Sequence, residues 1–209
     1  MSDRARQATG PAAAWPGDAE AGDDAALIRL SLEVPECFGA LFDRHAPAIH
    51  RYITQRLGPD AADDLVSESF LVAFRKRRRY DAAHADARPW LYGIATRLIA
   101  RRQRDEVRFF RAIARTGIDP AVEALADEVT NRVAAQAAGR ELAAALAGLS
   151  HAERDVLLLV ASGLSYQEAA LALHVPAGTV SSRLVRARRK VRGALSGQDP
   201  ARARRDSPE

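Results

Sequence analysis

The sequence predicts an all-α protein made of two small helical domains joined by a flexible linker. The 209 residues are rich in alanine and arginine, and only 6% are aromatic. Apolar residues recur at the three- and four-residue spacing of amphipathic helices, and no run of β-branched residues alternates as a strand would. This periodicity forms two blocks separated by a stretch in which it fades, so we expect two domains, each with its own core.

The first domain is expected over residues 24–105. A short helix is followed by a longer one, in which Pro47 should kink or locally break the helix. Pro59 opens the next helix, because proline suits a first helical turn. A basic run and a loop over residues 81–88 then lead to a further helix that begins at Pro89.

A linker is expected over residues 106–131, where the helical periodicity is weak, and the second domain over residues 132–195. Within this domain Ser150 and Glu153 form the S-x-x-E capping box that starts a helix, and Gly163 stops that helix. The second domain therefore begins with two helices, ahead of the pair described next.

The most informative stretch is a pair of predicted helices separated by a short turn. Ser165 and Glu168 form a second capping box, and Pro176 stops the first helix of the pair just before it. The second helix has an apolar stripe made by Val180, Leu184, Ala187, Val191 and Leu195. Small polar residues and arginines cover the opposite side, a pattern typical of a helix-turn-helix that reads the major groove of DNA. The alternative is a helix of an ordinary bundle with a solvated basic face.

Charge is distributed unevenly along the chain, although the formal net charge is only +4. Residues 75–104 carry ten arginines and lysines against two aspartates, and residues 164–195 carry six basic residues against one glutamate. Residues 1–24 are acidic instead, with five acids against two bases. Two basic blocks on predicted helices indicate a polyanion that is contacted at two places.

The ends of the chain, residues 1–23 and 196–209, have the composition of disordered tails. The N-terminal stretch lacks the basic start and apolar core of a signal peptide, and no apolar run is long enough to cross a membrane. Cys37 is the only cysteine, so no disulfide framework is possible and a reducing cytoplasm is the expected compartment. We expect Cys37 to be a small buried residue rather than a redox or catalytic thiol.

Five segments carry motifs of one protein family. They are residues 40–44, 62–70 and 88–95 in the first block, and residues 149–154 and 175–184 in the second. Through these segments the blocks resemble regions two and four of the extracytoplasmic-function (ECF) sigma factors, promoter-specificity subunits of bacterial RNA polymerase. The resemblance implies core RNA polymerase and both double- and single-stranded promoter DNA as partners, with no membrane partner. It also allows an anti-sigma factor as a further partner.

The resemblance implies that one segment of the first domain binds the clamp helices of the polymerase β′ subunit, and that the β flap is a further contact. Asp63, Asp64 and Glu68 would offer acidic side chains to basic residues of the partner, together with the apolar Leu65 and Phe70. An ordinary solvated acidic helix face is the alternative for these acids.

The resemblance further implies that the basic run, the loop after it and the following helix read and melt the minus-ten promoter element. The residues expected at DNA are Arg77, Arg78, Arg79, Tyr80, His84, Arg88, Arg97 and Arg101. The arginines would neutralise phosphates, while Tyr80 and the loop, with Asp86 near His84, would accommodate unstacked bases. Trp90 lies on the apolar stripe, so we expect it in the core. Arg97 stands where family members usually carry asparagine, so its expected contact is to phosphate.

The second helix of the helix-turn-helix would read the minus-thirty-five element. Ser182 and Arg186 are the expected readers of base edges. The residues expected closer to the DNA backbone are Thr179, Ser181, Arg183 and Arg189. Many relatives carry a basic residue in place of Ser181 and glycine in place of His174. These departures mark positions where promoter choice and turn conformation should differ from those of relatives.

Two other classes of protein share parts of this pattern. A two-component or quorum-type regulator has a similar helix-turn-helix, but it would need a preceding ligand-binding or phosphoacceptor domain with alternating strands and helices. An enzyme would need a catalytic or metal-binding constellation. The five histidines show no ligand spacing, and the sequence has no phosphate-binding glycine loop or nucleophile elbow. We therefore expect no catalytic residue, metal or cofactor in this chain.

Overall fold

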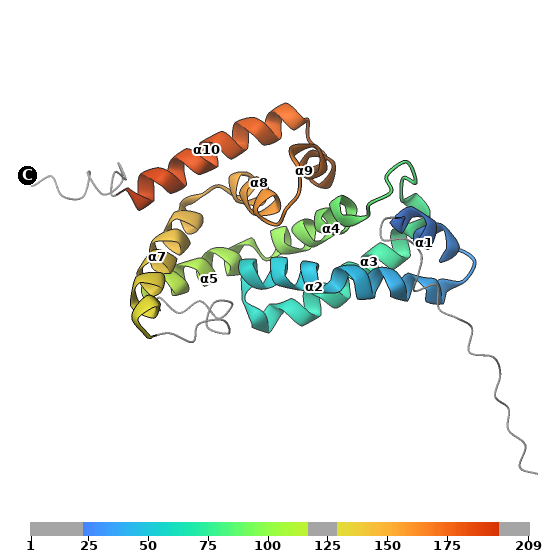
Figure 1. Ribbon diagram of the computed structural model, residues 1–209, viewed down its shortest axis with the longest axis horizontal. Helices are drawn as coiled ribbons and strands as arrows, with labels where there is room; N and C mark the ends of the chain where they lie inside the picture. Colours follow the sequence, from blue (N-terminus) through green and yellow to red (C-terminus); the bar gives the residue numbers. More distant parts are fainter. Residues whose placement is uncertain (1–22, 117–128, 197–209) are drawn as a thin grey trace, which may run out of the picture.

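The computed structural model describes residues 23–116 and 129–196, and in the second segment its side chains from residue 139 onward. Within these ranges the chain folds into helices and short 3₁₀ turns without any strand, so the predicted all-α class is confirmed. The N-terminal helices form an elongated bundle, and the C-terminal helices lie along one side of it (Figure 1). None of the helices in the described part of the chain has the length and apolar character needed to cross a membrane.

Over residues 23–116 the bundle consists of α1 (Asp24–Leu30), α2 (Phe38–Leu57), α3 (Ala62–Lys76), α4 (Arg88–Arg101) and α5 (Gln103–Thr116). The apolar positions that the helical spacing predicted are in its core. Leu41, Ile53, Leu65 and Ile99 each have at most 1% of their surface exposed. Burial of such side chains contributes about 1.5–3 kcal/mol each, which makes this core the main source of stability in the bundle.

Helix α2 passes through Pro47 without a break, so the expected interruption is not observed. Proline removes the hydrogen bond to the carbonyl four residues earlier. Asp43 and Pro47 are both exposed, which places that carbonyl on the solvent side of the helix. The helix ends at Gly58, whose φ of 87° suits glycine. A Cβ there would lie 2.9 Å from the ring of Phe109, so glycine also lets α5 dock on the end of α2.

Helix α5 replaces the first part of the expected linker. The sequence placed a linker from residue 106, but the chain is helical up to Thr116, and residues 117–128 lie outside the described part. Glu106, Phe110 and Ile113 follow i, i+4, i+7 spacing and are buried on one side of α5. A carboxylate at a buried position hid this stripe, because Glu106 is typical of a surface until its partners are known.

The C-terminal helices are α7 (Val129–Gly148), α8 (His151–Ala161), α9 (Tyr166–Leu173) and α10 (Ala177–Leu195). Both predicted capping boxes form, at Ser150 with Glu153 and at Ser165 with Glu168. In each box the serine side chain accepts from the glutamate backbone, and the glutamate side chain accepts from the serine backbone. Helices α9 and α10 form the predicted helix-turn-helix, and the start of its apolar stripe, beginning at Val180, is buried.

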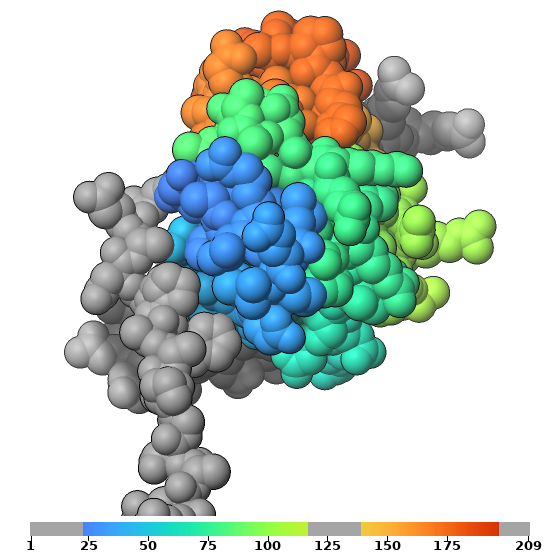
Figure 2. Space-filling view, turned by 90° about the vertical axis from the view of Figure 1, so that its right-hand side faces the viewer, coloured from blue at the N-terminus to red at the C-terminus, as the bar shows by residue number. Residues whose placement is uncertain are grey.

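The two sets of helices pack against each other. Buried residues of both belong to one continuous hydrophobic cluster, which contains Ile94 of α4 and Ala169 of α9. The contact is closest at Gly93, where a Cβ would lie 2.5 Å from the carbonyl oxygen of Ala172. Figure 2 shows the C-terminal helices, in orange, resting directly on the green residues of α4 and its preceding loop. We call this arrangement of the two sets the closed pair.

Candidate nucleic-acid interface

Helix α10 presents the predicted reading residues at its surface. Ser182 and Arg186 are exposed. Ser182 Oγ donates to Thr179 O at 3.1 Å, and Arg186 Nε donates to Ser182 O at 3.3 Å, so both side chains lie along the helix. The other residues predicted at DNA are exposed in the case of Ser181 and Arg189, and half-buried in the case of Thr179 and Arg183. The geometry leaves the first turns of α10 accessible to a groove of DNA.

Lys190 anchors the basic helix to the rest of the fold. Its Nζ lies 2.8 Å from Glu153 Oε2 of α8. Burial alone would raise the pKa of Glu153, but the hydrogen bonds from Lys190 and Ser150 lower it to about 2. The carboxylate stays charged at neutral pH, so it completes the capping box of α8 and fixes α10 against that helix. Lys190, which the sequence placed on the flank of the DNA-facing side, therefore has a structural partner.

The turn between α9 and α10 depends on His174. This residue has a left-handed backbone with φ of 56° and ψ of 45°, and no other non-glycine residue of the described chain has a positive φ. A non-glycine residue in this conformation costs about 1 kcal/mol or more. The His174 ring donates from Nδ1 to Leu171 O at 2.8 Å and so closes the end of α9. The position at which relatives carry glycine thus keeps a glycine-like conformation.

The residues predicted at the minus-ten element fall into two groups. Arg78, Arg79, His84, Arg97 and Arg101 are exposed, as a binding surface requires. They lie on the turn that ends α3, in the loop before α4 and on α4 itself. Their shared feature is an accessible cationic or polar group on or next to the two elements that the family motif singled out.

Arg77 and Arg88 are held by the protein instead. Arg77 donates to Phe74 O at 2.6 Å and to Ser31 O at 3.2 Å, and its guanidinium lies 3.7 Å from the centre of the Phe74 ring. Arg88 pairs with Asp86 at 2.7 Å and with Glu168 of α9 at 3.4 Å. Arg77 therefore has a structural role in place of the free guanidinium that the sequence suggested, and Arg88 links the loop to the C-terminal helices.

Tyr80 and Trp90 pack together beside this loop. Their ring centroids are 5.0 Å apart with an interplanar angle of 59°. Both rings are half-buried at the edge of the core, and the Tyr80 hydroxyl donates to His84 O at 2.6 Å. Trp90 is thus at the rim of the core, less buried than the sequence predicted, and Tyr80 ties it to the loop.

One residue that positions this loop was missed from the sequence. Asp24 was counted with the acidic N-terminal stretch, yet it is only 3% exposed. Its carboxylate accepts from Arg44 at 2.5 Å and from the backbone N–H of Ala87 at 2.8 Å, and it lies 2.8 Å from His45 Nε2. Burial opposes ionisation, but these contacts lower the pKa of Asp24 below its usual value. Its signal was spacing, since Asp24 shares one helix face with Ile28.

Helix α3 separates the residues predicted to bind polymerase into two kinds. Asp63 and Asp64 are exposed and Glu68 is half-buried on its outer side. Leu65 and Phe70 are only 1% and 5% exposed. The prediction of a direct polymerase contact is corrected for these two, because they lie on the apolar stripe that packs α3 into the bundle.

Exposed apolar side chains near this surface were missed. Leu71 of α3 is 47% exposed and Phe42 of α2 is 40% exposed. The rings of Phe42 and Phe70 meet edge-on at 4.8 Å, so Phe42 lies beside α3. The sequence had placed Phe42 on an inward stripe, because it follows directly after the buried Leu41. Together these side chains supply the apolar surface that Leu65 and Phe70 do not.

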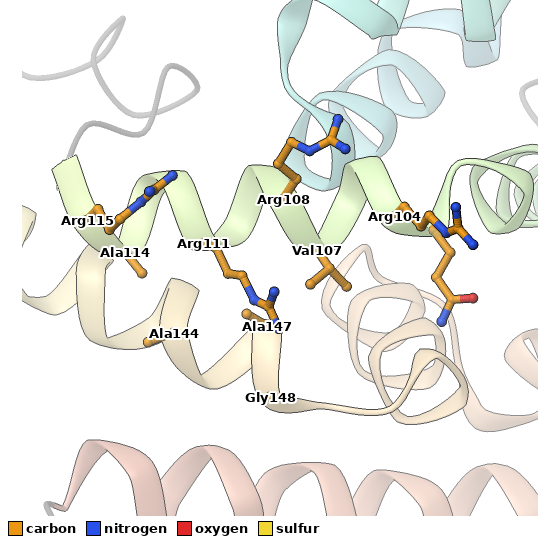
Figure 3. A pocket seen from close by; sticks show the side chains of 10 residues that line it. Arg104, Val107, Arg108, Arg111, Ala114, Arg115, Ala144, Ala147 and Gly148 are labelled. Carbon is orange, nitrogen blue, oxygen red and sulfur yellow. The ribbon is translucent and has the colours of Figure 1, made fainter.

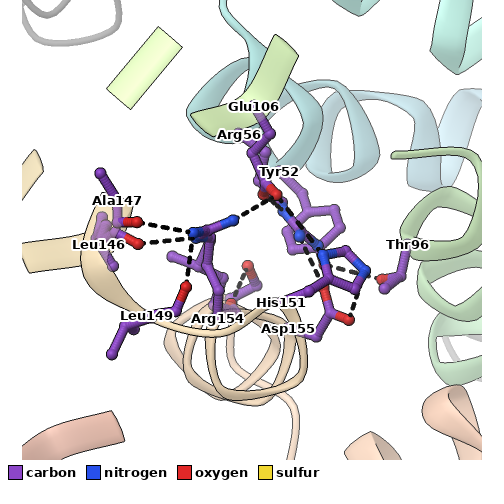
Figure 4. Close-up of polar contacts among 12 residues, drawn as sticks. Tyr52, Arg56, Thr96, Glu106, Leu146, Ala147, Leu149, His151, Arg154 and Asp155 are labelled. Atoms are coloured by element: carbon purple, nitrogen blue, oxygen red, sulfur yellow. Dashed lines mark hydrogen bonds and ion pairs between the residues drawn. The ribbon is translucent and has the colours of Figure 1, made fainter. Parts of the chain in front are cut away.

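A buried charge cluster joins the two sets of helices (Figure 4). Arg56 of α2 pairs with Glu106 of α5 at 2.5 Å and with Asp155 of α8 at 2.7 Å. Arg154 of α8 pairs with the same Glu106 at 2.8 Å and donates to the carbonyls of Leu146 and Leu149. None of the four charged side chains is more than 8% exposed. Both helix sets therefore contribute an arginine and a carboxylate to one contact.

The pKa shifts follow from this geometry. Burial alone would raise the pKa of Glu106, but contact with His151 at 3.7 Å and the guanidinium groups of Arg56 and Arg154 lower it to about 2. Burial raises the pKa of Asp155 even though Arg56 is adjacent. Glu106 is therefore the acid whose charge the cluster stabilises most clearly.

A groove of about 1020 Å³ runs between α5 and α7 (Figure 3). Four arginines of α5 line it opposite small residues of α7; these are Arg104, Arg108, Arg111 and Arg115, with Ala144 and Ala147. Figure 3 shows Arg111 directed toward α7 and Arg108 directed the other way. This basic surface lies in the stretch that the sequence had assigned to a linker.

Two family models match the chain. Sigma-70 region 2 matches residues 41–109, and Sigma-70, region 4 matches residues 139–191. The ECF RNA polymerase sigma factor SigC of Mycobacterium tuberculosis is 32% identical over 175 residues, which cover 81% of this chain and 91% of that protein. The RNA polymerase sigma factor NccH of Alcaligenes xylosoxydans is 29% identical, with 82% of this chain and 94% of that protein covered.

A helix-turn-helix with an exposed basic helix, joined to a second basic helical bundle, is the form of a bipartite DNA-binding protein. The chain belongs to the ECF sigma factors of RNA polymerase, as its motifs indicated. It is therefore a promoter-specificity subunit that acts with core polymerase on promoter DNA. Sigma factors are initiation factors without catalytic activity. A solved structure of CnrH in complex with the cytosolic domain of CnrY has the same fold, with a TM-score of 0.59 and 24% identity over 85% of this chain and 99% of that one.

Proposed function

We propose that this sigma factor recognises the minus-thirty-five element with the first turns of α10. The observation that carries the proposal is the exposure of Ser182 and Arg186 at the start of the second helix of a helix-turn-helix. A small serine permits close approach to the groove, and arginine can form paired hydrogen bonds with a guanine edge. Around them, the DNA backbone would be held by Thr179, Ser181, Arg183 and Arg189.

The minus-ten element would be read and melted by α4 and the loop before it. Exposed Arg78, Arg79, Arg97 and Arg101 would neutralise phosphates of the opened strands, and His84 would line the base site. The held residues Arg77, Tyr80 and Arg88 would support this surface by fixing the turn and the loop. Asp24 supports it in the same way, through its hydrogen bond to the last loop residue.

Core polymerase would bind the outer side of α3. Asp63, Asp64 and Glu68 offer charge to a basic partner such as the β′ clamp helices, and the exposed Leu71 and Phe42 add apolar contact. The C-terminal unit, near residues 132–195, would carry the second polymerase contact at the β flap. We infer that the chain itself catalyses no reaction and works where the polymerase is, in the cytoplasm. An anti-sigma partner is part of the proposal, because a solved relative, RpoE, is seen with the anti-sigma factor NepR of Bartonella quintana.

Promoter binding would require the closed pair to open. The names of the two elements place them roughly 25 base pairs apart, or about 85 Å at 3.4 Å per base pair. Helix α10 has 19 residues and is therefore about 28 Å long. A compact body of the described size has a radius of gyration of about 15 Å. One closed body does not span both elements, so the two sets of helices would separate on the promoter and expose the side of α4 that now faces α9.

Reconstituted transcription tests this function. Core polymerase with the purified chain should start transcripts from a small set of genomic fragments that core polymerase alone leaves silent. On such a promoter, Arg186→Ala should weaken binding by about 1–3 kcal/mol at one base step, or about 5- to 150-fold, because a bidentate contact is lost. The matched control Arg188→Ala removes an exposed charge from the same helix and should weaken all base variants equally. Equal behaviour of the two variants across the base panel would remove Arg186 from the reading role.

A further inference from the structure

Helix α5 carries a basic stripe that no promoter contact proposed above uses. The stripe consists of Arg104, Arg108, Arg111 and Arg115, all of them exposed. Their i, i+4, i+7, i+11 spacing keeps them within about 60° of one another around the helix. The buried residues of α5, from Glu106 to Ile113, lie on the opposite side. The stripe is therefore presented outward by a helix that is firmly packed on its other face.

The positive charge of the stripe is largely uncompensated. Arg108 pairs with Asp105 at 3.2 Å, but both side chains are more than half exposed, and such a pair is weak. Over residues 23–116 and 139–196, Arg104, Arg111 and Arg115 form no ion pair with a described carboxylate. The other acid of α5, Glu106, is buried and neutralised by Arg56 and Arg154. A polyanion would meet a nearly continuous row of guanidinium groups.

The place of the stripe in the chain indicates which polyanion it would meet. Helix α5 follows α4 directly, so the stripe extends the basic surface that ends at Arg101. From there the chain leads to the unit proposed to read the minus-thirty-five element, and the DNA between the two elements must run between the same two units. From Arg104 to Arg115 the stripe is about 16 Å long, which matches about five base pairs of duplex.

We propose that the α5 stripe binds the sugar-phosphate backbone of the duplex between the minus-ten and minus-thirty-five elements. The inference rests on the proposed function, in which the two units bind those elements. Phosphate contacts carry no sequence information, so the stripe adds affinity and register rather than specificity. Single-stranded DNA is a poorer fit, because the described lining of the groove beside the stripe contains no aromatic side chain on which bases could stack.

The test uses holoenzyme reconstituted with the full chain and a linear promoter fragment that the wild-type holoenzyme transcribes. The variant R104Q/R111Q/R115Q removes three charges from the stripe. The control R29Q/R51Q/R140Q removes three exposed charges elsewhere, from α1, α2 and α7. We expect the stripe variant to lower the slope of log affinity against log salt by up to about 2.7, at about 0.9 per phosphate contact. At about 0.15 M salt its affinity should fall about tenfold or more, while the control keeps the wild-type slope.

Charge-retaining and sequence-replacing arms complete the design. R104K/R111K/R115K should restore the salt slope, because lysine also neutralises phosphate. Replacing the DNA between the two elements by an unrelated sequence of equal length should leave the effect of the stripe variant unchanged. Equal slopes for the stripe variant and the control would overturn the proposal. So would a stripe effect that depends on the sequence of that DNA, or weaker binding of the variant to core polymerase without DNA, which would identify an acidic polymerase surface as the occupant. A wild-type holoenzyme that starts no transcript would count against the proposed function instead.

Discussion

The closed pair is held by two contacts that are built in opposite ways. Between α4 and α9, small residues bring two backbones together, with Gly93 against the carbonyl of Ala172. Between α2, α5 and α8, four charged side chains are buried together. Apolar surfaces of small residues separate and rejoin without leaving a charge behind, whereas the charge cluster separates only if each half keeps a partner for its own charges.

The cluster meets that condition. On opening, Arg56 of α2 would keep Glu106 of α5, since both belong to the N-terminal bundle. Asp155 would keep His151, which lies 3.2 Å away on the same helix, and Arg154 would keep the carbonyls near the end of α7. Neither half is left with an isolated buried charge, which makes reversible opening compatible with burying charges in the closed pair. The comparison therefore predicts different outcomes for damage to the two contacts.

Removing the central arginine of the cluster should have the largest effect. Arg56→Met leaves Asp155 and the inner oxygen of Glu106 buried without their cation, and the Tyr52 hydroxyl without its donor. Breaking a buried pair by removing one partner costs about 3–5 kcal/mol. We expect the free energy of unfolding, measured by urea titration with circular dichroism at neutral pH, to fall by that amount.

The matched control for this substitution is Arg51→Met. Arg51 lies on the same helix but is exposed, so the change should stay within about 0.5 kcal/mol of wild type. A loss below about 1 kcal/mol for Arg56→Met would show that water or rearranged side chains satisfy the carboxylates, and the contrast between the two contacts would then be lost.

Sequence reasoning recovered the α4–α9 side of this comparison far better than the cluster. The capping boxes, the stop before Pro176 and the stripe that begins at Val180 are local signals, and the structure confirms each of them. Arg56 and Glu106 carry no local signal, because each resembles a surface residue until a partner 50 positions away along the chain is known. The charge that hid the cluster also hid α5, which was assigned to a linker.

The candidate site shows the same division. Exposure of Arg186 and Ser182 was predictable, since both lie opposite a clear apolar stripe. The hold on Arg77 was not, because it depends on the backbone carbonyl of Ser31, which only the fold brings near. The role of Asp24 was missed for the same reason, as its partner at Ala87 is 63 positions away.

Acid should weaken the cluster and leave the α4–α9 contact intact. The pKa of Glu106 is about 2 in the fold against 4.5 for the free group. The folded chain therefore binds fewer protons there than the unfolded chain, and the stability is fully present above about pH 4.5 and lost as the pH falls toward 2. For this group alone the loss between pH 5 and pH 3 amounts to about 2 kcal/mol.

The raised pKa of Asp155 acts in the opposite direction, because that group gains a proton more readily in the fold. Urea unfolding of wild type and Glu106→Gln across this pH range isolates the contribution of Glu106. The variant should show a shallower dependence on pH. Parallel curves for the two proteins would mean that other carboxylates, such as Glu153, account for the acid sensitivity.

The smallest change in overall stability is expected from Gly93→Ala, and it sharpens the comparison most. Its Cβ would lie 2.5 Å from a backbone oxygen of α9, which no side-chain rotation relieves. Overpacking costs about 1–3 kcal/mol, but alanine in a helix gains back about 1 kcal/mol over glycine, so the net loss should stay below about 2 kcal/mol. Amide hydrogen exchange should accelerate in α9 and at the α4 surface facing it, while amides near Arg56 stay protected. Gly39→Ala is the control, because a Cβ there meets nothing within 4 Å and the change reports helix propensity alone. If Gly93→Ala exchanged no faster than Gly39→Ala, the backbone contact would not be what keeps α9 on α4. If amides around the cluster exchanged faster as well, the two contacts would open as one unit, and the distinction between them would be one of chemistry without a mechanical consequence.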